Sequence, residues 1–113
     1  PAFCIADNWR DNFKTTDEIP AEHDFWGLNL GKIFFTAMRD LYVFDTIGSF
    51  PKDVLIIHGD QDTIVSQELS KKAATHYPSA KLIILEGEGH GFSPEGGEIA
   101  MKHVLDYLNS HTN

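Results

Sequence analysis

Residues 54–65 read VLIIHGDQDTIV, and residues 81–92 read KLIILEGEGHGF. Each segment opens with a short run of apolar residues and continues into a loop that contains glycine and acidic residues. An apolar run without polar alternation is typical of a strand that is covered on both faces. These two segments therefore predict two buried strands, each followed by a polar loop.

A helix is predicted after each of these strands. Residues 66–77 read SQELSKKAATHY, where Ser66 can cap the helix start and Pro78 ends the helix. Residues 93–111 read SPEGGEIAMKHVLDYLNSH, where Ser93 can cap a second helix whose first turn holds a proline. The order strand, helix, strand, helix indicates a βαβ unit, whose strands are parallel and joined by a right-handed crossover.

The chain changes character near residue 27. Residues 1–26 show no clear helical or strand period and contain scattered aromatic residues, which is typical of an ordered surface excursion. Within residues 27–44, apolar side chains recur at helical spacing and predict a helix (Leu30, Phe34, Met38, Leu41). We therefore expect two parts, an insertion over residues 1–26 and an α/β part over residues 27–113.

The predicted sheet is incomplete as an isolated object. A two-stranded parallel sheet leaves two apolar edges with unpaired N–H and C=O groups, and such strands normally lie inside a larger sheet. We expect the remaining strands to come from a segment that is not present here, or from a second copy of the chain.

Charge and composition exclude several classes of partner. The net charge of -8 disfavours nucleic acid and an anionic membrane surface as partners. No apolar run approaches the roughly 20 residues of a membrane span. Cys4 is the only cysteine, so no disulfide can form within the chain. These features favour a cytoplasmic protein that binds neither nucleic acid nor membrane.

The loops that follow the two strands carry an aspartate and a histidine. Parallel strands end at the same edge of a sheet, where ligands of open α/β folds bind. Asp60 and Asp62 follow the first strand, and His90 follows the second. Adjacent strands lie about 4.8 Å apart, so an aspartate can accept the Nδ1–H of His90 and leave its Nε2 free as a general base.

Other interpretations of these loops remain open. An acidic residue after a strand can simply solvate a turn, and a histidine between glycines can be an ordinary loop residue. The set His58, Asp60, Asp62 and His90 could also bind a divalent ion, but its spacing matches no zinc or calcium motif. We therefore predict no metal and no cofactor, and we expect His58 to make a local hydrogen bond.

Taken together, the two segments resemble the C-terminal part of an α/β-hydrolase. Two patterns of that family are present: G-x-x-D-x-x-V at Gly59, Asp62 and Val65, and G-x-x-H-x-F at Gly87, His90 and Phe92. The family carries a catalytic triad in the chain order Ser, Asp, His. The resemblance implies that Asp62 is the triad acid, rather than Asp60, and that His90 is the base.

The wider chain is similar to one branch of that family, the bacterial cinnamoyl or feruloyl esterases, which are serine hydrolases with an inserted lid. This resemblance places residues 1–26 at the lid and implies a hydroxycinnamate ester as substrate. By the same resemblance, Asp7 and Asn8 are lid groups that could bind the phenolic hydroxyl of the substrate. Trp9 and Phe34, with other aromatic residues, could form a wall for a planar acyl group. The alternative for the aromatic residues is that they pack the insertion.

The nucleophile of such a hydrolase is missing from the chain. No G-x-S-x-G elbow is present, and neither Ser49, Ser93 nor Cys4 fits one. We expect the isolated chain to be inactive and to need the N-terminal part of a hydrolase. Two other functions remain open: a non-catalytic module that pairs with itself, and a peptidase or thioesterase on the same fold.

Overall fold

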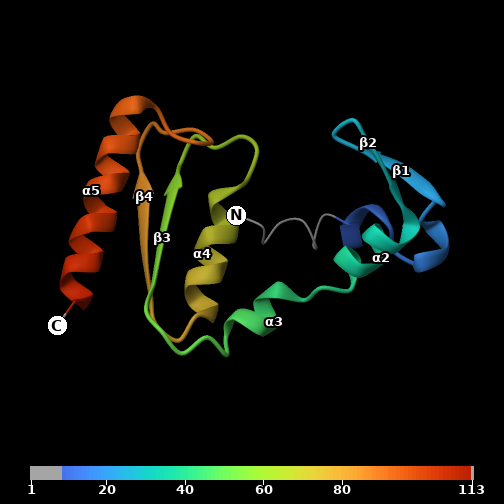
Figure 1. Cartoon of the computed structure of the whole chain (residues 1–113), viewed down its shortest axis with the longest axis horizontal. Coiled ribbons are helices and arrows are strands. Elements are labelled where there is room, and N and C mark those ends of the chain that lie inside the picture. The colour runs from blue at the N-terminus through green and yellow to red at the C-terminus, as the bar shows by residue number, and fades with distance from the viewer. Residues whose placement is uncertain (1–8, 113) are drawn as a thin grey trace. The chain divides into compact units, whose positions relative to one another are not determined.

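The computed structural model describes residues 9–112, and the chain divides after Phe44 into two compact units. The first unit contains a 3-10 helix η1 (Thr16–Glu18), strands β1 (Glu22–Phe25) and β2 (Leu28–Gly31), and helix α2 (Lys32–Arg39). Helix α3 (Val43–Ile47) spans the division. The second unit contains strand β3 (Val54–Gly59), helix α4 (Gln67–His76), strand β4 (Ala80–Leu85) and helix α5 (Pro94–His111), as Figure 1 shows.

The first unit is built on a β-hairpin that the sequence pattern does not predict. Strands β1 and β2 pair antiparallel through a two-residue turn, and both turn residues have positive φ, 53° at Trp26 and 80° at Gly27. This is the conformation of a type I′ turn, whose twist suits a hairpin. The helix predicted within residues 27–44 is α2, which begins only after β2 has ended. The expected division after Trp26 lies inside this hairpin.

Aromatic side chains form the core of the first unit. Trp9, Ile19 and Phe35 are buried. Five partly buried side chains pack against them (Phe13, Phe25, Leu30, Phe34, Met38). The ring of Trp9 lies 4.7 Å from the ring of Phe35 in an edge-to-face arrangement, which is a favourable geometry for aromatic pairs.

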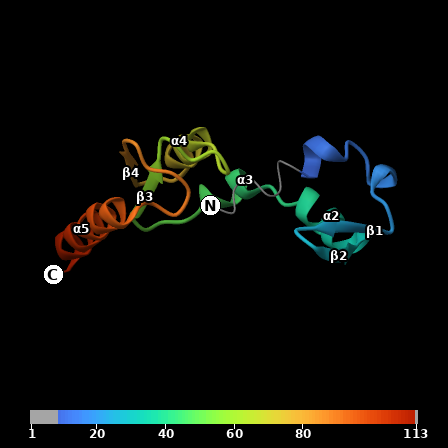
Figure 2. The same ribbon diagram turned by 90° about the horizontal axis from the view of Figure 1, so that it is seen from above.

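The second unit confirms the predicted βαβ arrangement. Strands β3 and β4 are parallel, in a register that runs from Val54 opposite Ala80 to Gly59 opposite Leu85. The two helices lie on opposite faces of this strand pair (Figures 1 and 2). Both predicted caps are present, because the hydroxyl of Ser66 accepts the N–H of Glu68 and the hydroxyl of Ser93 accepts the N–H of Gly96.

The second unit leaves apolar surface exposed. Four apolar side chains of α5 are more than half exposed (Ile99, Met101, Leu105, Leu108). Within residues 9–112, β3 pairs with no strand other than β4. Exposed apolar side chains beside an open strand pair are the surface that a larger α/β sheet buries. None of the helices in this described range is long and apolar enough to cross a membrane.

Candidate active site at the carboxyl ends of the parallel strands

The turn after β3 fixes the carboxylate of Asp62. Its Oδ1 accepts two backbone hydrogen bonds, from the N–H of Ile64 at 2.9 Å and from the N–H of Val65 at 2.8 Å. Aspartate favours such turns because its side chain can bond the backbone a few residues further along. One oxygen of the carboxylate is thereby held by the turn, and Oδ2 remains for other partners.

The loop that carries His90 is tied to the turn after β3. The N–H of Gln61 donates to the carbonyl of Glu88 at 2.9 Å, and the N–H of Gly87 donates to Asp60 Oδ1 at 2.8 Å. Gly59 makes this approach possible, because a Cβ at that position would lie 2.2 Å from the Glu88 carbonyl oxygen. The two loops therefore form one hydrogen-bonded layer at the edge of the sheet.

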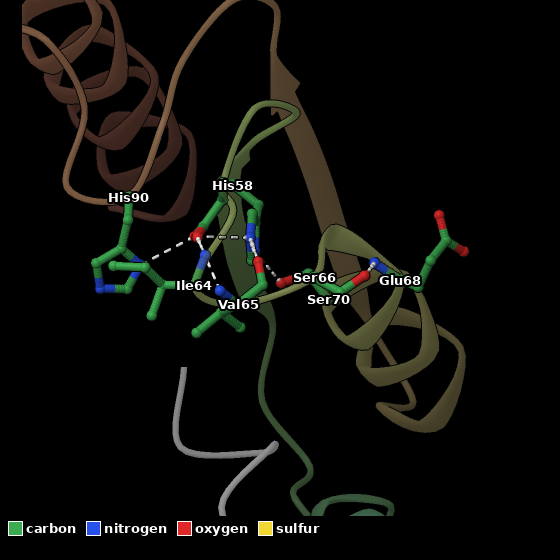
Figure 3. A network of polar contacts seen from close by, with 8 residues as sticks. His58, Ile64, Val65, Ser66, Glu68, Ser70 and His90 are labelled. Carbon is green, nitrogen blue, oxygen red and sulfur yellow. Dashed lines mark hydrogen bonds and ion pairs between the residues drawn. The ribbon is translucent and has the colours of Figure 1, made fainter.

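These loops bring Asp62 and His90 into contact. His90 Nδ1 lies 3.0 Å from Asp62 Oδ2, which makes Nδ1–H the donor and leaves Nε2 without this partner (Figure 3). The side chain of Asp62 is 5% exposed, whereas that of His90 is 48% exposed. The buried carboxylate suits a group that orients the histidine. The half-exposed imidazole suits a base that must reach a reactant.

The environment of Asp62 favours its ionised form. Burial acts to raise the pKa of Asp62, but the hydrogen bonds from Val65, His90 and Ile64 outweigh it and lower the pKa to about 2. A carboxylate that accepts several hydrogen bonds is stabilised in its charged state. Asp62 is therefore an acceptor at neutral pH and can hold one tautomer of His90.

His58 is a buried neighbour of this pair, with 3% of its surface exposed. Its Nδ1 lies 2.7 Å from the hydroxyl of Ser70, and its Nε2 lies 2.9 Å from the carbonyl of Val65. The expected local hydrogen bond of His58 is thus present. The sequence did not reveal that Nε2 also lies 3.1 Å from Asp62 Oδ2. The contact between His58 and Ser70, twelve residues further along the chain, also has no signal in the sequence.

Glu88 fastens the His90 loop to helix α5. Its carboxylate accepts the N–H of Ser93 at 2.6 Å and the hydroxyl of Ser93 at 2.8 Å. An acidic group at a helix start is favoured by the helix dipole. A Cβ at Gly96 would lie 2.1 Å from this carboxyl group, so the glycine leaves room for it. This role of Glu88 was not predicted from the sequence. The pattern that could have indicated it is an acidic residue shortly before a capping serine.

The four expected substrate-binding residues fall into two groups. Asp7 and Asn8 fall outside the described residues. Trp9 is 7% exposed and belongs to the aromatic core of the first unit, and the half-buried Phe34 packs against that core. Their contact with a substrate stays a prediction.

A cleft of about 430 Å³ lies away from the acid–base pair. It is lined by residues at the starts of β3 and β4 and by the C-terminal half of α5, including Asp53, Lys81 and Tyr107. Asp62 and His90 follow the opposite ends of those strands. The cleft therefore does not contribute to the site described above. In the described part of the chain, no group of three or more His, Cys, Asp or Glu residues could hold a metal ion.

Comparison with known proteins matches one family model and 15 chains of solved structures, among them the two described next. The sequence model of the TAP-like protein family matches residues 43–113. The structure of ferulic acid bound to Est1E from Butyrivibrio proteoclasticus is similar with a TM-score of 0.84 at 27% sequence identity. The structure of Est1E from the same organism gives a TM-score of 0.85 at 27% identity. No curated protein matches the chain.

The coverage of these structural matches is uneven. The similarity extends over 97% of this chain but over only 46% and 47% of the two Est1E chains. This chain therefore spans less than half the length of the structures it resembles.

Proposed function

This chain belongs to the TAP-like protein family of α/β-hydrolases, and from that premise we propose that it supplies the acid and base of a serine carboxylic ester hydrolase. The observation that carries the proposal is the hydrogen bond between His90 Nδ1 and Asp62 Oδ2, with the imidazole half exposed. In this fold the acid and the base follow two late strands in that order.

The proposed reaction is acyl transfer through a serine from outside these 113 residues. The serine hydroxyl attacks the ester carbonyl while its proton passes to His90 Nε2. The same proton then passes to the leaving alcohol, which leaves an acyl-enzyme that water hydrolyses with His90 as base. Asp62 holds Nδ1–H in place and stabilises the imidazolium that forms. None of these steps needs a metal or cofactor.

We propose esters of hydroxycinnamic acids as the substrate class. The support is that one of the similar structures, Est1E, has ferulic acid bound. In this proposal residues 1–26 belong to a lid, and Asp7, Asn8, Trp9 and Phe34 are its candidate substrate contacts. The partner of the chain is then the N-terminal part of the hydrolase, which carries the nucleophile and the oxyanion hole.

Two proteins test this function: the 113-residue chain, and a longer protein in which the natural upstream sequence precedes it. Methyl ferulate and a p-nitrophenyl ester serve as substrates, and a fluorophosphonate labels an active serine. We expect turnover and labelling only in the longer protein. His90→Ala should abolish turnover there, whereas His103→Ala, on α5, should preserve it.

Two results would contradict the proposal. Turnover by the isolated chain that depends on His90 would show that no outside nucleophile is needed. A longer protein without hydrolytic activity, combined with a folded dimer of the isolated chain, would favour a module that pairs with itself.

A further inference from the structure

His58 contacts both parts of the turn that holds the acid. It lies in β3 and is almost completely buried. Its Nε2 faces two oxygens, the carbonyl of Val65 at 2.9 Å and Oδ2 of Asp62 at 3.1 Å. A carbonyl and an ionised carboxylate can only accept hydrogen bonds. Nε2 must therefore carry a hydrogen.

The other side of the imidazole is held by helix α4. His58 Nδ1 lies 2.7 Å from the hydroxyl of Ser70, a residue with no exposed surface. In the neutral imidazole Nδ1 is an acceptor, so the hydroxyl of Ser70 is the donor. Hydrogen bonds then run in one direction, from Ser70 through His58 to the turn that follows β3.

This arrangement closes the turn from two sides. The N–H of Val65 donates to Asp62 Oδ1 at 2.8 Å, and the carbonyl of Val65 is opposite His58 Nε2. Oδ2 receives His90 and lies beside the same Nε2 of His58 (Figure 3). Without His58, the Val65 carbonyl would lose its partner in a buried position, which favours a rearranged turn.

We propose that His58, supported by Ser70, is a positioning residue that fixes Asp62 so that its Oδ2 meets His90. This inference rests on the proposed function, because it assigns His58 to the same acid–base pair. His58 acts through Asp62 and touches no substrate. Its contribution is a donor at one particular position, the position of Nε2.

Two substitutions separate this role from simple filling of the core. A glutamine at position 58 can place an amide N–H near the position of Nε2, whereas an asparagine reaches only the position of Nδ1. In the longer hydrolase, His58→Gln should keep kcat within about fivefold of the wild type. His58→Asn and His58→Leu should lower kcat by about 10- to 100-fold, as expected for the loss of a donor to a charged group. KM should change less than twofold, and His76→Leu, on the exposed end of α4, should leave kcat unchanged.

Equal activity of His58→Asn and His58→Gln, or an active His58→Leu, would overturn the proposal. Ser70→Ala provides a variant that removes only a hydroxyl from a helix. It should lower kcat by about 2- to 10-fold. An unchanged kcat would contradict the supporting role of Ser70.

A spectroscopic test on the 113-residue chain is independent of catalysis. Long-range 1H–15N correlation spectra of the imidazoles should show His58 with its hydrogen on Nε2 and His90 with its hydrogen on Nδ1. Ser70→Ala should accelerate exchange of the His58 Nε2 hydrogen. A His58 hydrogen on Nδ1 alone would refute the inference even if the longer protein were an active esterase. Conversely, an inactive longer protein with the expected His58 tautomer would refute the proposed function and leave the hydrogen-bond assignment intact.

Discussion

Replacement of Gly59 by alanine should separate the loops that carry Asp62 and His90. A Cβ at this position would lie 2.2 Å from the carbonyl oxygen of Glu88 and 2.6 Å from its carbonyl carbon. An ordinary contact begins near 3.4 Å, so the Glu88 backbone must retreat by about 1.2 Å. These atoms are backbone, so no side-chain rotation can relieve the overlap.

The expected cost follows from what this movement disturbs. Insertion of a methyl group into a well-packed site costs about 1–3 kcal/mol. The same movement lengthens the hydrogen bond from Gln61 N–H to the Glu88 carbonyl, now 2.9 Å, whose loss adds about 1 kcal/mol. We expect Gly59→Ala to lower the free energy of unfolding by about 2–4 kcal/mol.

Urea unfolding followed by far-UV circular dichroism measures this change. With a slope of about 2 kcal/mol per molar urea, the midpoint should fall by about 1–2 M. Gly97→Ala is the matched control, because a Cβ added there would meet no atom within 4 Å beyond its own stretch of α5. Alanine should stabilise that helix by up to about 1 kcal/mol.

If the proposed function holds, the effect on activity can be measured in the longer protein. His90 lies two residues beyond Glu88, so a displacement of about 1 Å should lower kcat by about 100-fold. A Gly59→Ala chain within about 0.5 kcal/mol of the wild type would refute the argument that close packing of the loops needs this glycine.

Three further predictions concern other parts of the chain. Because the pKa of Asp62 is lowered from 3.8 to about 2, its stabilising effect should be complete above about pH 4 and disappear as pH falls through 2, which urea unfolding across this pH range measures, while a 13C titration of the carboxylate should give the lowered pKa. The hydroxyl of Ser79 and the imidazole of His111 lower the pKa of Asp53, and the contact with His111 ties the last turn of α5 to the start of β3. Asp53→Asn should therefore speed amide exchange in that turn, and unchanged exchange would contradict this prediction. Trp26→Asn should stabilise the hairpin by about 0.5–1 kcal/mol in amide exchange, because asparagine tolerates the positive φ of this exposed position better than a bulky residue.

The sequence was sufficient to predict the second unit because its signals are local. Uniform apolar runs mark β3 and β4, and capping serines mark α4 and α5. The predicted α/β-hydrolase fold is confirmed by the family match and by the similar structures. The contact between Asp62 and His90 follows from the fold, since parallel neighbouring strands deliver their following loops to one edge.

The hairpin of the first unit was missed because its turn lacks the usual signal. A type I′ turn usually has asparagine or aspartate before glycine, and here Trp26 occupies that position. The contact of His58 with Asp62 was missed for a different reason. It depends on the path of the turn after β3, which the apolar pattern of the strand does not specify.

The acid–base pair also has a consequence for the order of folding. Asp62 and His90 are 28 residues apart, and a single βαβ crossover brings them together. Because loop-closure entropy grows with the number of residues enclosed, closing this 28-residue loop costs less entropy than closing a loop to a more distant segment. We therefore expect the pair to form while this unit folds, before any contact with a distant segment of a longer chain. Under the proposed function, the acid and the base would then be assembled within one folding unit, and activity would begin only when the segment that carries the nucleophile docks.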